Sequence, residues 1–291
     1  MKNKKIKILI SPASYDGRKI FRKLRNNKRY DIKGFIDNDK KKKYLYKQKV
    51  FHISKLKNLD YDKIITGGRY FAEVCSALKK KKIPQEKITI LPKKKFDYSK
   101  KELLIRSFKT HKILKKFVEI VEKRKIDYLL DASSILAVIR KVSLAKFSDV
   151  DILMDSQFKN LFLKEIKKIK NVIIKKDFIK IRKRIILKRV IILSKKKGFF
   201  EEPCVFDIAF FWNDGLKYYK YFVNKKTYLP NYIFEGSFKI KYKNFNLSIP
   251  KNYKKYMKSL FGNKWIKPDD YFQEKQHFKG LFTKTFFKNF L

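Results

Sequence analysis

Cysteine is nearly absent from this chain, which has Cys75 and Cys204 as its two cysteines in 291 residues. They fall in different predicted domains, so neither a disulfide framework nor a zinc site can be built from them. This scarcity is typical of the reducing cytoplasm. Glycine and proline are also scarce, at 9 and 7 residues, while lysine, isoleucine and phenylalanine are abundant. That balance is the composition an AT-rich genome imposes.

The sequence also lacks a long apolar run. Its N-terminal segment has a basic start, but the apolar run after Lys7 consists of Ile8, Leu9 and Ile10, which is too short for a signal peptide. No segment approaches the roughly 18 apolar residues that a membrane-spanning helix needs. We therefore expect a cytoplasmic protein, and any contact with an anionic membrane would be peripheral, at the inner face.

Acidic residues are few relative to basic ones, with 27 Asp plus Glu against 76 Lys plus Arg and a formal net charge of +49. Such an excess indicates either a surface for nucleic acid or anionic lipid, or a coding bias toward lysine. The lysines are scattered over every segment instead of forming one stripe, which favours the bias. In both cases the surface should hold polyphosphate and acidic headgroups loosely and in a salt-dependent manner.

The chain does contain enough apolar residues for two cores. Hydrophobic residues make up 44% and aromatic residues 16% of it, and its length favours two domains. Residues 1–95 alternate strand and helix patterns, which predicts an α/β, Rossmann-like domain with a parallel sheet. A lysine-rich segment at 93–101 marks the boundary. Residues 102–291 are predicted to form an α+β domain with a mixed sheet, beginning with a helix whose apolar face includes Leu104, Phe108 and Phe117.

Three aspartates are candidates for metal-dependent chemistry. Asp149 and Asp151 flank Val150 at the start of a predicted strand, where residues two apart point to the same face. Two carboxylates this close repel unless a cation lies between them, and Mg²⁺ prefers one or two carboxylates together with phosphate oxygens. Asp207 lies in an otherwise apolar strand, where an ionised carboxylate needs a partner or a metal. The alternatives without a functional role are that Asp149 and Asp151 lie in a solvated turn and that Asp207 faces solvent.

A turn upstream of these aspartates has the features of a phosphate site. Asp131-Ala132-Ser133-Ser134 joins a predicted strand to a predicted helix, where free backbone N–H groups and serine hydroxyls can bind phosphate. An ordinary N-cap is the alternative role for these serines. Arg140, six residues after Ser134, could reach a phosphate oxygen.

One residue of the first domain is a candidate for cofactor binding. Asp37 ends the second predicted strand, where an acid can bind a ribose hydroxyl. The first loop, residues 11–17, lacks the glycine fingerprint of dinucleotide-binding proteins, so a purely structural domain is an equal alternative.

Together, the motifs of the second domain resemble the LicD family, whose relatives include the fukutin-related proteins. That family has an Asp-Gly-Thr turn, a short helix ending in arginine and an Asp-x-Asp, which residues 131–152 match, and a later strand aspartate, which Asp207 matches. Its closing motif resembles Ile249 to Asn252, Tyr256, Met257, Phe261, Gly262, Trp265 and Pro268. There are two departures: Ala132 stands at the usual glycine, and residues 146–148 replace positions that are commonly aromatic and acidic.

The resemblance implies a nucleotidyltransferase fold for residues 102–291 and a phosphotransferase activity. A phospho-alcohol group, such as phosphocholine or a pentitol phosphate, would pass from a CDP-activated donor to a sugar hydroxyl of a glycan acceptor on the cell surface. Mg²⁺ or Mn²⁺ would be held by Asp149, Asp151 and Asp207. Substrate phosphates would be bound by Asp131, Ser133, Ser134 and Arg140.

Two other functions remain open at this point. The same fold could transfer a nucleotide to a small molecule or to RNA, and the basic surface would then serve as an RNA-binding face. A non-catalytic protein that binds polyanions is the third alternative. The scattered lysines make nucleic acid the less favoured partner.

Overall fold

The computed structural model describes residues 4–68, 70–182, 184–196, 198, 201–222, 225–263 and 265–267. The described residues divide into two compact units, the first ending at Tyr98 and the second running from Ser99 to Lys267. In the described part the division therefore falls between Tyr98 and Ser99. The predicted boundary lies between residues 95 and 102. Everything after Lys267, including Pro268 of the closing motif, lies outside the described residues.

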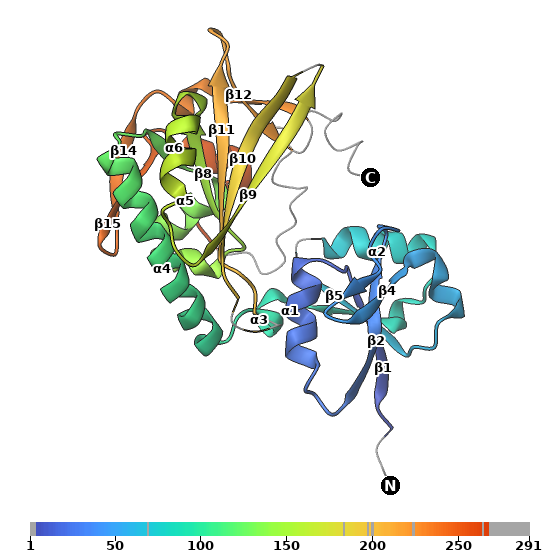
Figure 1. Ribbon diagram of the computed structural model, residues 1–291. Helices are drawn as coiled ribbons and strands as arrows, with labels where there is room; N and C mark the ends of the chain where they lie inside the picture. The colour runs from blue at the N-terminus through green and yellow to red at the C-terminus, as the bar shows by residue number, and fades with distance from the viewer. Residues whose placement is uncertain are drawn as a thin grey trace. The chain divides into compact units, whose positions relative to one another are not determined.

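The first unit is built on a six-stranded sheet with the strand order β3-β4-β2-β1-β5-β6. Neighbouring strands are parallel except β3 and β4, so the parallel sheet predicted from the alternating pattern is present (Figure 1). The strands are β1 Ile6–Ser11, β2 Tyr30–Asp37, β3 Tyr44–Leu45, β4 Gln48–His52, β5 Lys63–Gly67 and β6 Ile88–Leu91. The helices are α1 Tyr15–Leu24, α2 Phe71–Lys80 and α3 Lys93–Phe96, with 3-10 turns η1 Ile53–Asn58 and η2 Gln85–Lys87.

The core of this unit forms around β1, which has strand neighbours on both sides. Ile8, Leu9 and Ile10 are each at most 1% exposed, because a central parallel strand is covered on both faces and needs consecutive apolar residues. Helix α1 packs so closely on the loop before it that a Cβ at Gly17 would lie 1.9 Å from the Pro12 carbonyl oxygen. Glycine is therefore required at that position.

The second unit is built on a seven-stranded mixed sheet. Strands β13-β12-β11-β10-β9 are antiparallel neighbours, while β8 pairs with β11 in parallel and with β7 in the antiparallel sense. The strands are β7 Tyr128–Leu130, β8 Val150–Asp155, β9 Val172–Ile181, β10 Arg184–Ser194, β11 Val205–Asn213, β12 Tyr218–Phe222 and β13 Lys225–Leu229. A separate hairpin consists of β14 Ser237–Tyr242 and β15 Phe245–Pro250.

The helices of the second unit are α4 Lys100–Lys123, α5 Ala132–Ile139, α6 Lys159–Ile166 and α7 Tyr253–Phe261, with 3-10 turns η3 Leu144–Lys146, η4 Ser156–Phe158 and η5 Asn231–Ile233. The chain is therefore a mixed α/β protein, as expected, with a parallel sheet in one unit and a mixed sheet in the other.

Helix α4 begins at a capping box. The Ser99 hydroxyl accepts the backbone N–H of Glu102 at 3.3 Å, and the Glu102 carboxylate accepts the backbone N–H of Ser99 at 2.7 Å. The buried stripe of the helix contains Arg106, Thr110, Ile113, Leu114, Phe117, Val118 and Val121. Leu104 and Phe108 are 71% and 62% exposed, so their predicted place on the apolar face is wrong. Counting back from Phe117 in steps of three and four residues, the buried face contains Ile113, Thr110 and Arg106.

The buried Arg106 ties together two loops that precede sheet strands. Its guanidinium donates to the carbonyl oxygens of Ala145 and Phe147, at 3.1 and 3.2 Å, and of Glu202 and Pro203, at 3.2 and 3.1 Å. The first loop leads into β8 and the second into β11. A planar group with five fixed donors can satisfy several carbonyls at once, which explains how the charge is buried here.

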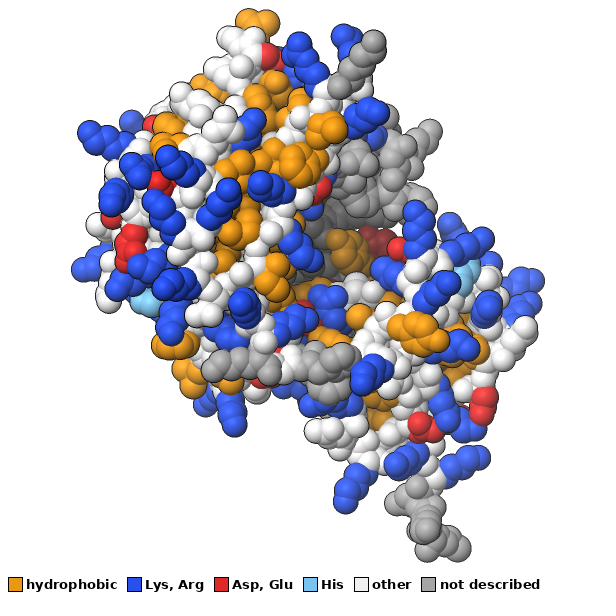
Figure 2. All heavy atoms as spheres, viewed as in Figure 1, with side chains coloured by type: hydrophobic (Ala, Val, Ile, Leu, Met, Phe, Trp, Pro, Cys, Tyr) orange, Lys and Arg blue, Asp and Glu red, His pale blue; other side chains and the backbone are white. Residues whose placement is uncertain are grey.

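The surface carries its positive charge in a dispersed form. Figure 2 shows Lys and Arg side chains over the visible surface of both units without a single continuous stripe. Among the described residues, none of the helices is long and apolar enough to cross a membrane.

The capping box of α4 generates a stability prediction. Replacing Ser99 by alanine should lower the free energy of unfolding by about 1 kcal/mol, because the helix loses its N-cap acceptor. Urea unfolding followed by circular dichroism measures the change. Lys115→Ala, at an exposed position of the same helix, is the matched control and should shift the free energy by less than about 0.5 kcal/mol. Equal effects of the two substitutions would contradict a role for the cap.

Candidate active site

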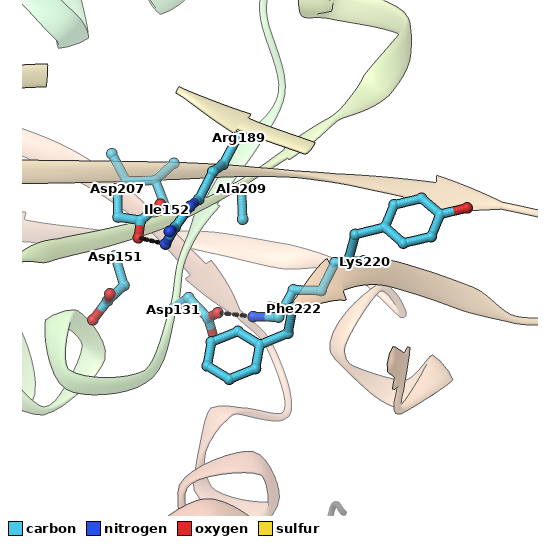
Figure 3. Close-up of a pocket in the computed structure, with 9 residues that line it drawn as sticks. Asp131, Asp151, Ile152, Arg189, Asp207, Ala209, Lys220 and Phe222 are labelled. Atoms are coloured by element: carbon cyan, nitrogen blue, oxygen red, sulfur yellow. Dashed lines mark hydrogen bonds and ion pairs between the residues drawn. The ribbon is translucent and has the colours of Figure 1, made fainter. Parts of the chain in front are cut away.

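Three aspartates lie in one row across neighbouring strands of the mixed sheet. Asp151 of β8 and Asp207 of β11 are register partners in the parallel ladder. Asp131 follows β7 directly, and its backbone N–H donates to the Asp151 carbonyl at 2.9 Å. In-register residues of adjacent strands point to the same face, so the three carboxylates occupy one face of the sheet (Figure 3). The structure thus brings together acids that are 76 residues apart along the chain.

The turn after β7 positions Asp151 through its two serines. The Ser133 hydroxyl donates to Oδ2 of Asp151 at 2.8 Å. The Ser134 hydroxyl accepts the backbone N–H of Asp151 at 2.7 Å, and Ser134 is fully buried. Both serines were predicted to bind substrate phosphates, but in the described structure their hydroxyls hold the aspartate of the next strand.

Asp207 is held by an arginine that sequence reasoning missed. The Arg189 guanidinium donates to Oδ2 of Asp207 at 2.7 Å and also to Asp177 at 2.7 Å. The other oxygen, Oδ1, is buried and has no hydrogen-bond partner among the described residues. Burial raises the pKa of the Asp207 carboxyl above its ordinary value; the charge of Arg189 opposes this rise, and the charge of Asp149 adds to it. One oxygen of Asp207 is therefore available to accept a proton or a cation.

Asp131 is the most enclosed of the three acids, at 5% exposure. It forms an ion pair with Lys220 of β12 at 2.8 Å, and it accepts from the Tyr256 hydroxyl at 2.6 Å and from the Ala132 N–H at 2.8 Å. Burial alone would raise the pKa of Asp131, but the Lys220 charge and these hydrogen bonds outweigh it and lower the pKa. Asp131 is therefore a carboxylate that stays ionised and is committed to partners within the protein.

Repulsion among the acids is greatest at Asp151. Burial raises its pKa well above the ordinary value, and the charges of Asp149, Asp131 and Asp207 raise it further, against the Ser133 hydrogen bond. Asp149 itself accepts a hydrogen bond from the neighbouring Ser148 hydroxyl. A charge cluster of this kind favours binding of a proton or a cation.

The row of acids opens into a small cavity of about 70 Å³. Its walls include Asp131, Asp151, Arg189, Asp207, Ala209 and Lys220. Neither Arg189 nor Lys220 was predicted to be a site residue, because a lysine-rich chain gives a single cation on a strand no distinguishing signal. The strand register explains the position of Arg189. It lies opposite Ala209, which is two residues from Asp207 on β11.

Two other predicted site residues lie elsewhere. The Arg140 guanidinium donates to the backbone carbonyls of Trp265 and Lys267, the latter at 3.0 Å, and is not part of the cavity wall. In the first unit, Asp37 accepts the backbone N–H groups of Ala13 and Asp39 and pairs with Lys42 at 2.9 Å. Both carboxylate oxygens of Asp37 are thus already engaged by groups of the same unit.

The fit of a divalent cation can be tested on the donor set. Among the described residues, no group of three or more His, Cys, Asp and Glu side chains is arranged as a complete metal site. Mg²⁺, however, commonly takes one or two protein carboxylates and completes its shell with water and substrate phosphates. The raised pKa of Asp151, to which the neighbouring charge of Asp149 contributes, fits such a partial site. The residues therefore suit a cation that arrives with a phosphate ligand.

Backbone strain marks the start of α5. Ala132 has a φ of +41°, in the region where an L-residue with a Cβ is disfavoured. The Ala132 N–H donates to the Asp131 carboxylate. The next two residues, Ser133 and Ser134, are hydrogen-bonded to Asp151. The turn therefore keeps a strained conformation while it positions two of the three acids.

Comparisons with known proteins give little. No model of a known protein family matches the sequence, and no curated protein matches it. Among solved structures, the chain is similar to the lincomycin-bound crystal structure of the lincosamide antibiotic adenylyltransferase LnuA, with 16% identity and a TM-score of 0.34. The match covers 64% of this chain and 97% of the LnuA chain. A similarity this low carries no argument about fold or function.

The assignment to the LicD family is therefore wrong, because no model of a known protein family matches the chain. The motifs misled because each is short and can arise outside the family. Residues of the supposed family motif have local roles instead. The carbonyl of Phe147 accepts from Arg106, and the carbonyl of Trp265 accepts from Arg140.

The strained turn generates a second prediction. Ala132→Gly should raise the free energy of unfolding by about 0.5–1 kcal/mol, because relief of roughly 1–2 kcal/mol of left-handed strain exceeds the entropic cost of glycine. Ala137→Gly, inside the same helix, should lower it by about 1 kcal/mol. Urea unfolding of both variants measures the difference. If both substitutions destabilise the protein equally, the turn is not strained.

The like-charge cluster generates a third prediction. Because the folded-state pKa of Asp151 is raised, its ionisation destabilises the fold above that pKa, and the penalty disappears below the ordinary carboxyl pKa of about 3.9. Asp151→Asn should therefore stabilise the metal-free protein at pH 7.5 by on the order of 1 kcal/mol. The gain should shrink when unfolding is measured at pH 4.5.

Asp155→Asn, on the same strand, is the control for this substitution. Asp155 caps η4 through the backbone N–H of Gln157, and asparagine caps equally well, so little change is expected. An Asp151→Asn variant that is less stable than the parent at pH 7.5 would rule out the repulsion described above.

Proposed function

We propose that the second unit is a nucleotidyltransferase that transfers a nucleotide from a nucleoside triphosphate to a hydroxyl of a small molecule. The observation that carries this proposal is the row of Asp131, Asp151 and Asp207 on one face of a mixed sheet, beside a cavity lined by Arg189 and Lys220. Phosphoryl chemistry needs carboxylates that can share a divalent cation and cations that can offset phosphate charge.

Asp149 and Asp151 are the residues that would hold Mg²⁺. When bound there, the ion would offset the negative charge that builds up on the phosphates during transfer. The high proton affinity of Asp151 supports this assignment, since a cation relieves the same repulsion as a proton.

Asp207 has the properties of a general base. Its Oδ1 is buried without a partner, and its pKa is raised by burial, which makes the carboxylate a better proton acceptor near neutral pH. In the reaction, the acceptor oxygen forms a bond to the α-phosphorus, the bond to the bridging oxygen of the β-phosphate breaks, and pyrophosphate leaves. The proton of the hydroxyl passes to Oδ1 of Asp207.

Lys220 and Arg189 would offset the negative charge of the triphosphate. Both cations are tied to acids of the row, at 2.8 and 2.7 Å. The charge of Asp131 raises the pKa of Lys220 despite the burial that would lower it, so Lys220 remains a cation at the cavity wall. A triphosphate that enters the cavity would meet two fixed positive charges, and positioned charges of this kind contribute strongly to phosphoryl transfer.

A small acceptor fits better than RNA. The cavity at the acids is small, and the basic side chains on the visible surface form no continuous track (Figure 2). Proteins that follow such a backbone use a groove lined with positive charge.

We also infer that the first unit is Rossmann-like. In the order β2-β1-β5, the chain first adds strands on one side of β1 and later adds β5 and β6 on the other side. Such a reversal is the property of doubly wound parallel sheets.

The proposed function predicts loss of transfer on removal of single carboxyl charges. With Mg²⁺, the four nucleoside triphosphates and a panel of small alcohols and sugars, Asp151→Asn and Asp207→Asn should each reduce nucleotide transfer by at least about a hundredfold. EDTA should abolish it. Pyrophosphate release and mass spectrometry of the products measure the reaction.

Asp155→Asn is the control and should retain activity. Since Asp151→Asn is also expected to stabilise the fold, its inactivity would not reflect unfolding. Full activity of both active-site variants would overturn the assignment. Transfer to RNA, or RNA binding that persists at physiological salt, would favour the nucleic-acid alternative instead.

A further inference from the structure

An aromatic side chain, that of Phe222, stands at the mouth of the cavity that holds the acids. Phe222 lines this cavity together with Asp131 and Lys220, and it is the one exposed residue among the nine that do, at 37% exposure. Figure 3 shows its ring beside the ion pair of Lys220 with Asp131. A single exposed apolar side chain needs no explanation by itself. This one, however, is placed where a ligand of the charged cavity would leave the protein.

The volume of the cavity decides which part of a nucleotide can enter it. A cavity of about 150 Å³ holds a benzene ring, whereas this one measures about 70 Å³. The base of a nucleotide therefore stays outside. Phosphate groups are smaller, and their charge is opposite to that of Arg189 and Lys220 in the cavity wall. The phosphates thus occupy the cavity, and the base lies at its mouth.

Strand geometry places Phe222 within reach of that base. Lys220 and Phe222 are two residues apart on β12, so their side chains leave the strand on the same face, about 6.6 Å apart. Tyr221 between them points to the opposite face, where its ring packs 5.3 Å from that of Trp212. The ribose of a nucleotide spans a similar distance between phosphate and base. A phosphate in the cavity near Lys220 therefore brings the base to the Phe222 ring.

We propose that Phe222 binds the base of the nucleoside triphosphate by stacking. This inference rests on the proposed function, because it extends the same site to the base of the donor nucleotide. Every base has a π-face, so all four nucleotides can stack, and the larger purines stack more strongly. The charged side chains of the described cavity wall are engaged with one another, so stacking is the main source of base preference.

Nucleotide binding to the full chain tests the stacking without any transfer. The probe is the Mg²⁺ complex of α,β-methylene-ATP, in which the bond that would break is replaced, and calorimetry at physiological salt measures its affinity. Phe222→Ala should weaken this binding at least about fivefold, but should leave the affinity for magnesium tripolyphosphate, which has no base, unchanged. Phe222→Trp should retain the affinity for the nucleotide. Phe178→Ala, at an exposed position of β9 outside the cavity wall, is the matched control and should change neither affinity.

A comparison of bases checks the same inference independently. The α,β-methylene analogue of ATP should bind about threefold or more tightly than that of CTP, because the purine offers a larger stacking surface. This preference should disappear in Phe222→Ala.

The outcomes separate this inference from the proposed function. Absence of binding of the ATP analogue, or equal affinity of the parent chain and Phe222→Ala for it, would overturn the stacking role even in a chain that transfers nucleotide. An equal loss of affinity for the analogue and for tripolyphosphate would do the same. Base-dependent binding that Phe222→Ala removes, in a chain that transfers no nucleotide to any acceptor, would retain the base site and refute the proposed function.

Discussion

The parallel pairing of β8 with β11 is the constraint on which the site depends. It sets Asp151 beside Asp207, and the antiparallel pairing of β7 adds Asp131 to the same row. A shift of one residue in this register would turn an aspartate into the apolar layer and an isoleucine into the cavity. The alternation on β11, where Phe206, Ile208 and Phe210 are fully buried around half-buried Asp207 and Ala209, opposes such a shift.

Bringing carboxylates into a row costs free energy, and the structure offsets that cost in different ways at each acid. Asp131 has a lysine, a tyrosine and a backbone N–H. Asp207 has an arginine on one oxygen only. The Asp151 carboxylate accepts a hydrogen bond from the Ser133 hydroxyl and has no ion pair among the described residues. The negative charge is therefore neutralised most completely at Asp131. It is neutralised least completely at Asp151 and Asp207, where we place the metal and the proton transfer. Fold stability and reactivity consequently depend on the same unbalanced charge.

Sequence reasoning predicted the elements better than the contacts. The alternating patterns in the first hundred residues and the apolar strand patterns of the second unit predicted the parallel sheet and the mixed sheet, because burial dictates residue type at those positions. The catalytic roles of Asp149, Asp151 and Asp207 stay predictions. The partners Arg189 and Lys220 could not be found, since their pairing depends on the order of strands β10, β11 and β12 in space. The contacts of Ser133 and Ser134 could not be predicted for a related reason, because a hydroxyl at a helix start can face a ligand or a neighbouring strand, and the pairing of β7 with β8 brings Asp151 within reach of both.

Arg106 shows a limit on how the composition of this chain can change. One guanidinium joins the loops before β8 and β11 through four carbonyl oxygens, and thereby aligns both acid-bearing strands from a helix that contributes nothing to the cavity wall. A lysine ammonium has three donors at a single point and cannot span the same carbonyls. In a chain that uses lysine freely elsewhere, this position should resist replacement by lysine during evolution, and homologues that keep the row of acids should keep arginine there.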